Sequence, residues 1–280
     1  MQKIVDVQGR ARDYVDEVIE LAAGRDDGVA SVVVFGSVVK GRFTPGTSDV
    51  DVIVVLADDA LRGRRKELDG RLAALELKHG LRERLRSKAE VVYQMVDRMC
   101  GLFLSHFVCY KRDLLAGNSA RAFGVNPLAD LTLLSTRIGF AGIVTSAKTV
   151  WGEDLLIEVR IPPITRWHLL MNCLAYLSLN ALALFTFPVL PNATRYAMMA
   201  LKGALHGCYF CYNLKSATIE LEVDFFTEKL GGPTTLAALL SLRQVYRSDF
   251  RFVGRCFSTI TRLYTMTAGE NRFPIHVRSL

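Results

Sequence analysis

The sequence predicts a mixed α/β or α+β domain at the N-terminus, followed by a domain built of helices alone. Two observations carry this division. In the first 110 residues, amphipathic helical stretches alternate with short runs rich in Val and Ile, as in a domain that combines helices with a sheet. Beyond Pro162-Pro163, which interrupts regular structure, the apolar segments are long enough for helices. We therefore expect domains at residues 1–160 and 161–280.

Periodicity and turn signals place the individual elements. The helices expected in the N-terminal domain span residues 9–24, a short stretch from Gly36-Ser37, and residues 61–86; its strands span 31–35, 50–56, 89–96 and 106–111. The helices expected in the C-terminal domain span residues 165–187, 193–214, 217–230, 234–247 and 249–267.

Composition indicates a globular chain with a substantial core, because half of its residues are hydrophobic and 22% are charged. The formal net charge of +7 favours anionic partners. Residues 62–86 hold nine basic and four acidic side chains, so this helix is a candidate RNA contact. It lacks interleaved aromatic residues, however, and a charged surface helix with a solvated face explains the pattern better. The six cysteines lack the spacing of a disulfide framework, and the charged N-terminus does not resemble a secretion signal. We therefore expect a cytoplasmic protein.

One apolar stretch raises the question of a membrane. Residues 167–194 contain no Lys, Arg, Asp or Glu. A stretch of this length could span a bilayer. The stretch also carries His168, Asn172 and Asn180, and it is interrupted by Pro188. We interpret it as a buried helix of the C-terminal domain and expect no membrane partner; a membrane anchor is the alternative.

Two aspartates open the second expected strand. Side chains two residues apart in a strand point to the same face, so the Cα atoms of Asp49 and Asp51 lie about 7 Å apart. Two neighbouring carboxylates repel each other unless a cation lies between them. Oxygen ligands suit Mg²⁺, and two such ions can hold the attacking and leaving oxygens of a nucleotidyl displacement.

A glycine-serine turn precedes the aspartates. Gly36 allows close approach of the backbone, and backbone N–H groups together with the Ser37 hydroxyl can bind phosphate. The spacing of Gly36 and Gly41 resembles a P-loop, but Arg42-Phe43 stands where a P-loop has Lys followed by Ser or Thr. The P-loop interpretation therefore fails.

The pattern Gly36-Ser37-x3-Gly41-x6-Ser48-Asp49-x-Asp51 resembles the signature of the polymerase-β-like nucleotidyltransferase superfamily, in its minimal and antibiotic-modifying branches. The resemblance covers roughly residues 28–110. It implies an α+β nucleotidyltransferase domain with a small mixed sheet, followed by an all-α helical bundle. A segment that includes "TVWGEDLL" also resembles the end of such domains.

The resemblance implies a role for each matching residue. Asp49 and Asp51 would be catalytic and hold the metal, in a site for two Mg²⁺ ions. Relatives have a third carboxylate on a later strand, for which Glu90 is the first choice and Asp97 and Asp113 are rivals. The residues expected to bind the nucleotide are Gly36, Ser37, Lys40, Arg42 and Ser48.

The leading hypothesis is a Mg²⁺-dependent enzyme that transfers an NMP group from an NTP, expected to be ATP, to a hydroxyl and releases pyrophosphate. The acceptor is a small molecule such as an aminoglycoside, a protein side chain or an RNA 3′ end. The alternatives are a nucleotide-binding or toxin–antitoxin-type partner module with weak or lost transfer activity, and a nucleotidyltransferase directed at tRNA or other RNA. A homodimer is left open. His206, Cys208 and Cys211 invite a zinc interpretation, but buried helical cysteines explain them better.

Overall fold

The computed structural model describes residues 9–24, 28–40, 50–61, 63–81, 105–125, 136–190, 192–232 and 234–277. Contacts between Cα atoms divide the chain into two compact units. The first unit contains Met1–Asp130, Ile143–Pro162 and Arg278–Leu280, and the second contains Leu131–Gly142 and Pro163–Val277. Each unit is described by itself.

The first unit is built on a four-stranded sheet with the strand order β3-β2-β1-β4. Its strands are β1 (Val29–Phe35), β2 (Asp51–Leu56), β3 (His106–Tyr110) and β4 (Lys148–Gly152). β1 is antiparallel to β2 and to β4, whereas β2 and β3 are parallel. The small mixed sheet implied by the sequence is therefore confirmed.

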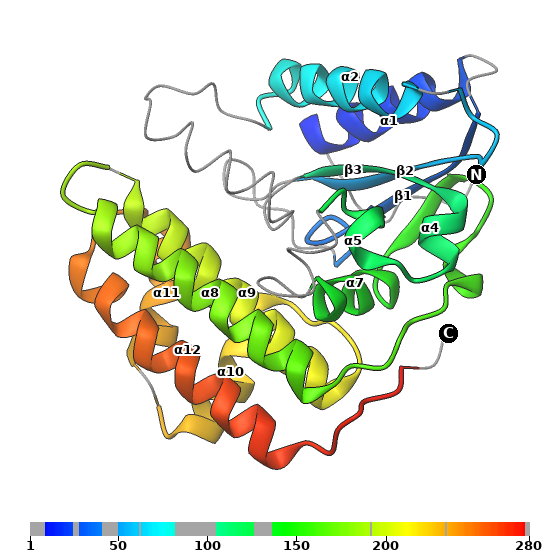
Figure 1. Cartoon of the computed structure of the whole chain (residues 1–280). Helices are drawn as coiled ribbons and strands as arrows, with labels where there is room; N and C mark the ends of the chain where they lie inside the picture. The colour runs from blue at the N-terminus through cyan, green and yellow to red at the C-terminus, as the bar shows by residue number, and fades with distance from the viewer. Residues whose placement is uncertain are drawn as a thin grey trace. The chain divides into compact units, whose positions relative to one another are not determined.

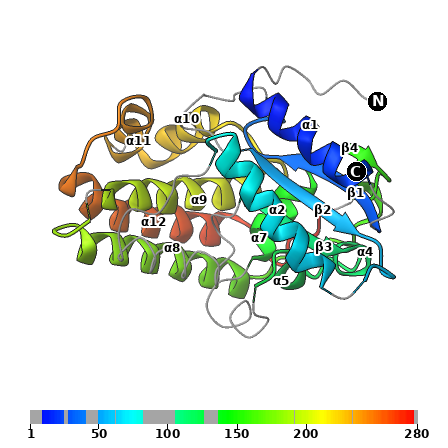
Figure 2. The ribbon, with the colours of Figure 1, turned by 90° about the horizontal axis from the view of Figure 1, so that it is seen from above.

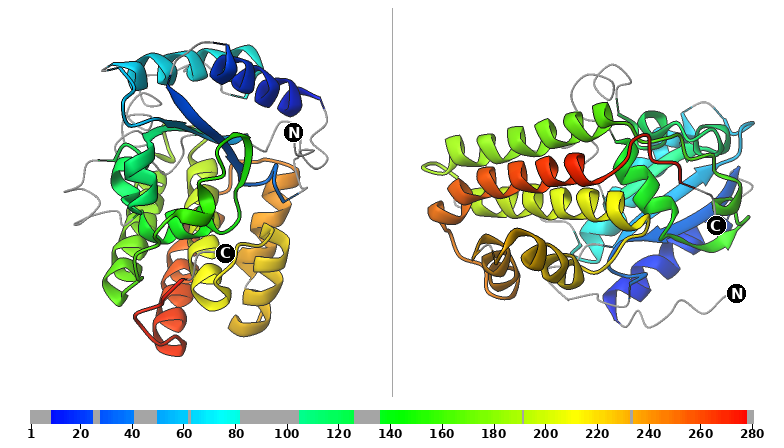
Figure 3. Two further views of the ribbon diagram at one scale, coloured as in Figure 1. Left: turned by 90° about the vertical axis from the view of Figure 1, so that its right-hand side faces the viewer. Right: turned by 90° about the horizontal axis from the view of Figure 1, so that it is seen from below.

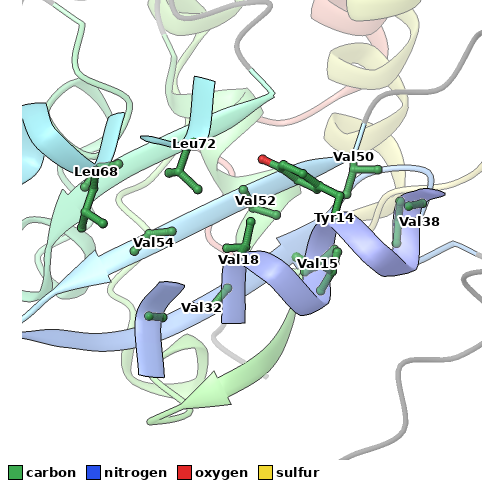
Figure 4. Packing of buried hydrophobic residues seen from close by; sticks show 14 of the residues in the cluster. Tyr14, Val15, Val18, Val32, Val38, Val50, Val52, Val54, Leu68 and Leu72 are labelled. Carbon is green, nitrogen blue, oxygen red and sulfur yellow. The ribbon is translucent and has the colours of Figure 1, made fainter. Parts of the chain in front are cut away.

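Valine and isoleucine runs make β1 and β2 buried strands. Two helices, α1 (Arg10–Ala23) and α2 (Arg64–Lys78), cover one face of the sheet. Side chains of these helices and of the sheet form a core cluster between the two layers (Figure 4). Its members are Ala11, Tyr14, Val15, Val18, Ala22, Val32, Val34, Val38, Val50, Val52, Val54, Leu56, Leu68, Leu72 and Val108. Burying one such valine stabilises the fold by about 1.5–3 kcal/mol, so this cluster holds β1 and β2 against the two helices.

The opposite face of the sheet packs against the short helices α4 (Lys111–Leu115) and α5 (Ser119–Ala122), as Figure 1 and the left view of Figure 3 show. Phe107 of β3 contacts both the sheet and this helical layer. Its ring centroid lies 6.1 Å from that of Phe35 at the end of β1 and 4.7 Å from that of Phe123, which follows α5. With both faces covered, the middle strands have hydrophobic side chains on both sides, as their near-continuous apolar sequence requires.

The second unit consists of helices. They are α8 (Arg166–Thr186), α9 (Ala193–Asn213), α10 (Ile219–Leu230), α11 (Thr234–Gln244) and α12 (Phe250–Glu270). α8, α9 and α12 run side by side (Figure 2). Small residues in α9 allow this close packing, because Gly203 lies against the Tyr176 ring and has no room for a Cβ atom. Two short elements complete the description: most of α7 (Arg137–Val144) belongs to the second unit, whereas the 3₁₀ turn η2 (Leu156–Glu158) belongs to the first.

Most of the expected elements are found, with specific differences. The five C-terminal helices and the first and second strands lie where they were predicted, within a few residues. Residues 36–40 form a turn, so the helix expected to start at Gly36-Ser37 is wrong over these residues. The strand expected at 89–96 lies outside the described residues. α4, α5, α7 and β4 were not expected, because short or half-exposed elements leave little periodic signal.

In the part of the chain that the structure describes, α8 is the one helix whose length and apolar composition would suffice to cross a bilayer. In its most apolar stretch, 44% of the residues are buried inside the protein. This burial agrees with a packed helix of the second unit.

Candidate active site

The turn after β1 begins at Gly36, whose φ of +76° belongs to the left-handed region. Glycine adopts this region without the steric cost that a Cβ atom brings. Two residues later Val38 enters the core beside Val50, and both side chains are almost completely buried. Val38 therefore anchors the turn, while Ser37 and Lys40 remain half-exposed.

Asp51 lies against this turn. It is the first residue of β2 and pairs with Phe35, the last residue of β1. A Cβ atom built on Gly36 would overlap Oδ2 of Asp51 and lie 3.2 Å from its Cγ. The half-buried carboxylate therefore occupies the space that any other residue at position 36 would need. Sheet register thus brings a predicted metal ligand and the predicted phosphate turn together.

Glu76 of α2 contacts the start of β3, which lies beside the start of β2. Its buried carboxylate accepts a hydrogen bond from Ser105 Oγ, and its Oε1 lies 2.7 Å from His106 Nδ1. The carbonyl of Ser105 in turn accepts the N–H of Val52 at 2.8 Å. Val52 directly follows Asp51, so this network fixes the backbone that carries the Asp51 side chain.

His106 is charged at neutral pH in this environment. Burial by itself lowers the pKa of His106, but hydrogen bonds to Asp69 and Glu76 outweigh it and raise the pKa to about 9. Asp69 Oδ1 lies 3.2 Å from His106 Nε2. The imidazolium therefore lies between two carboxylates and offsets the cost of burying Glu76.

Tyr14 of α1 lies across β2, between Val50, Val52 and Leu72 (Figure 4). Its hydroxyl is buried and has no hydrogen-bond partner among the residues that the structure describes. Burial, and then the negative charges of Glu76 and Asp51, raise the pKa of Tyr14 far above its ordinary value. Its phenol therefore remains neutral where it packs against the start of β2.

Four predicted site residues fall in the described part of the chain: Gly36, Ser37, Lys40 and Asp51. The turn and the first residue of β2 bring them to one end of the β1–β2 pair. The other predicted site residues, Arg42, Ser48, Asp49 and Glu90, lie outside the described residues, as do the signature residue Gly41 and the rival Asp97. The assignment of site residues as a whole therefore stays a prediction.

Asp51 fits a hard cation, because a half-buried carboxylate supplies the oxygen donors that Mg²⁺ prefers. Within the described ranges no group of three His, Cys, Asp or Glu side chains could hold a metal. The remaining ligands would have to come from Asp49 and Glu90, the two other carboxylates predicted for this site.

The topology argues against Asp113 as the third carboxylate. β3 runs parallel to β2, with His106 beside Val52 and Tyr110 beside Leu56. Asp113 follows the end of β3 and therefore lies at the end of the sheet opposite to Asp51. It is buried and faces Arg121 at 3.6 Å, so it has a structural partner there.

The residues that sequence reasoning missed are Glu76, Ser105 and His106. One signal for Glu76 was available: it follows Leu72 by four residues and thus falls on the buried stripe of its helix. The many basic residues of this helix favour a charged surface helix, and this pattern obscures the signal for Glu76. His106 and Ser105 gave no signal, since their role depends on the pairing of distant strands.

Partners within the protein occupy several basic side chains of α2. Arg64 lies 2.7 Å from Glu67, Arg71 lies 3.5 Å from the same carboxylate, and Lys78 lies 2.7 Å from Glu17 of α1. Some of the basic residues at 62–86 therefore form ion pairs within the protein. An RNA contact through this segment stays a prediction.

The cysteines of α9 belong to the core of the second unit. Cys208 and Cys211 are buried, and burial raises the pKa of the Cys211 thiol to about 12. The neighbouring His206 faces the buried carboxylate of Glu222, with Nδ1 2.6 Å from Oε2. The arrangement agrees with packing cysteines rather than with thiolate ligands of zinc.

Comparisons with known proteins bear on the class of enzyme. Residues 15–99 match the family model of the nucleotidyltransferase domain. This segment contains the Gly36 turn, Asp51 and Glu76. Residues 15–99 therefore correspond to a nucleotidyltransferase domain, which confirms the predicted resemblance to the polymerase-β-like nucleotidyltransferases and the predicted class of enzyme.

One solved structure extends the likeness to the helical unit. Spectinomycin adenyltransferase from Enterococcus faecialis, determined with ATP and spectinomycin, superposes with a TM-score of 0.53 at 11% sequence identity. The match covers 92% of this chain and 98% of that protein. At this identity the likeness shows the fold alone. A search of curated proteins finds no match to the sequence.

Proposed function

We propose that this protein transfers an NMP group from ATP to a hydroxyl of a small molecule, with Mg²⁺, and releases pyrophosphate. The observation that carries the proposal is the Asp51 carboxylate lying against the left-handed Gly36 turn. A carboxylate beside a phosphate-binding turn is the arrangement that metal-dependent nucleotidyl transfer requires. The fold neighbour supports the choice of ATP and of a small-molecule acceptor, because it was determined with ATP and an antibiotic.

The residues of this chain have separate roles in the proposed reaction. The turn at Gly36 and Ser37 binds the triphosphate, and Lys40 and Arg42 neutralise its charge. Asp49, Asp51 and Glu90 would hold Mg²⁺, which when bound stabilises the charge that develops on the phosphate oxygens.

Glu90 also accepts the proton of the acceptor hydroxyl. The hydroxyl oxygen then forms a bond to the α-phosphorus of the nucleotide. The bond between that phosphorus and the bridging oxygen breaks, and pyrophosphate leaves with the electron pair.

The test is a screen of the four α-³²P-labelled NTPs with Mg²⁺ and three acceptor classes: spectinomycin and aminoglycosides, tRNA, and cell-extract protein. The proposal predicts a labelled small molecule formed from ATP. Label in tRNA or protein would move the acceptor to the RNA-directed or protein-directed alternative. A protein that binds ATP tightly and labels nothing would instead be a nucleotide-binding module.

A further inference from the structure

Two chain connections meet at one end of the second unit. They are the connection from α8 to α9 and the connection from α11 to α12, which Figures 1 and 2 both show at the same end of the helices. The N–H of Asp249 donates to Thr194 Oγ1 at 2.9 Å, and the rings of Phe187 and Phe250 lie 5.1 Å apart. Residues 185–189 and 245–251, together with Arg195, are called the helix-end patch below.

The helix-end patch exposes large apolar side chains. Phe185 is 80% exposed, Val189 74%, Val245 75% and Phe250 57%. Single exposed apolar residues are ordinary, but several gathered in one place mark a surface that meets another apolar body. Pro188 stiffens the first connection, since its ring fixes φ. The patch thus holds its apolar residues toward solvent on a restrained backbone.

Positive charge accompanies these apolar residues. Arg195, Arg247 and Arg251 are exposed at the patch, and the guanidinium of Arg195 lies 5.7 Å from the centre of the Tyr246 ring. Asp249 is the one acidic residue within the patch, and its carboxylate accepts the N–H of Phe252 to cap α12. The excess of arginine therefore favours a partner with negative charge.

We propose that the helix-end patch binds the surface of a membrane containing anionic lipids. Phenylalanine, tyrosine and aliphatic side chains with an arginine rim suit the boundary between headgroups and acyl chains. A single-stranded nucleic acid fits less well: bases could stack on the aromatic rings of the patch, but the exposed Val189 and Val245 offer no ring and suit an apolar partner. A second copy through the same patch would bring like charges together.

The proposed contact differs from a transmembrane anchor. α8 leads into the patch, but 44% of its most apolar stretch is buried inside the protein. Only the end of the unit would enter the lipid, as a peripheral contact. This proposal revises the expectation from the sequence that the protein has no membrane partner.

The test is co-sedimentation of the full-length protein with vesicles of phosphatidylcholine alone or mixed with phosphatidylglycerol. We expect binding to the anionic vesicles to be roughly ten- to a hundredfold tighter, and high salt to weaken it. Phe185→Ser combined with Val189→Ser should abolish binding, and Arg247→Gln combined with Arg251→Gln should remove the preference for anionic lipid. Leu221→Ser, at a leucine of α10 that is 57% exposed, is the matched control and should bind as the unaltered protein does.

Three outcomes would overturn the proposal. One is that the folded, unaltered protein does not bind anionic vesicles. Another is that the patch variants, with unchanged circular dichroism, bind as tightly as Leu221→Ser. The last is that light scattering shows a dimer, or a fluorescent oligonucleotide binds, and the patch variants lose that interaction without any change in vesicle binding.

Discussion

The carboxylate of Asp51 occupies the space where a side chain at position 36 would lie, so Gly36 and Asp51 form one structural unit. The pairing of Phe35 with Asp51 sets the distance between them, and the left-handed backbone of Gly36 turns the chain away at that point. Two short motifs separated in sequence are thus brought into contact through strand register. Each can be tested through the other.

Gly36→Ala should weaken ATP binding by roughly tenfold or more, equivalent to about 1.4 kcal/mol. The added methyl group would displace the Asp51 carboxylate and strain a left-handed backbone. Gly231→Ala is the matched control, because Gly231 has a φ of +73° with no atom within 4 Å of a built Cβ. Calorimetry measures the ATP affinity of both variants, and thermal denaturation measures their stability. Both variants strain a left-handed backbone, but only Gly36→Ala also displaces the Asp51 carboxylate. If both variants kept full affinity, the contact between Gly36 and Asp51 would have no part in the site.

Asp51→Asn should reduce ATP affinity in the presence of Mg²⁺ by at least about tenfold, since an amide is a poor ligand for a hard cation. Asp113→Asn tests the rival carboxylate at the other end of the sheet and should leave affinity unchanged if the variant is folded. Calorimetry with and without Mg²⁺ provides the measurement. Equal Mg²⁺-dependent affinity in Asp51→Asn and the unaltered protein would refute the metal assignment.

Glu90→Gln should lower kcat by about 10²–10⁴-fold while ATP binding is largely kept, because the amide retains the shape of the side chain but cannot take a proton. The assay is the initial rate of nucleotidyl transfer at saturating ATP, with binding measured separately. Loss of binding as well would identify Glu90 chiefly as a metal ligand. Full activity would remove it from the site and leave Asp97 as the carboxylate to test.

The buried contacts of His106 should make stability depend on pH. The pKa of His106 is raised to about 9 in the folded protein, above the ordinary 6.5. Its stabilising contribution is therefore fully present below about pH 6.5 and is lost as pH rises through 9. We expect His106→Gln to lower the free energy of unfolding by about 1–3 kcal/mol at pH 6.5 and by less at pH 9.5.

Urea denaturation of both proteins at the two pH values measures this difference. His276→Gln, at an exposed histidine of the second unit, is the control. A constant difference between His106→Gln and the unaltered protein at both pH values would mean that the charge of His106 does not contribute.

Local sequence carried much of the fold. Runs of Val and Ile defined β1 and β2, and long apolar segments defined the C-terminal helices, because these elements bury most of their side chains. The signature that includes Gly36 and Asp51 predicted the class of enzyme. Each of these features depends on residues close together in the chain.

The features that sequence reasoning missed depend on distant contacts. Basic residues surround Glu76 in the sequence, which suggests an exposed position, but its side chain is buried against the start of β3. The register that brings Ser105 to Val52 arises from a parallel pair of strands separated by about fifty residues. Residues 36–40 form a turn because Gly36 is left-handed and Val38 must reach the core. Periodicity places Glu76 on the buried stripe of its helix, but it does not report the contacts of Glu76 with β3, the strand register or the turn.

The central claim is that the site at Gly36 and Asp51 performs nucleotidyl transfer. The most direct measurement follows α-³²P-ATP and released pyrophosphate together in one reaction with Mg²⁺ and the acceptor found in the screen. The account predicts equal amounts of labelled acceptor and pyrophosphate from the unaltered protein, and neither product from folded Asp51→Asn. Transfer by Asp51→Asn at the unaltered rate would contradict it.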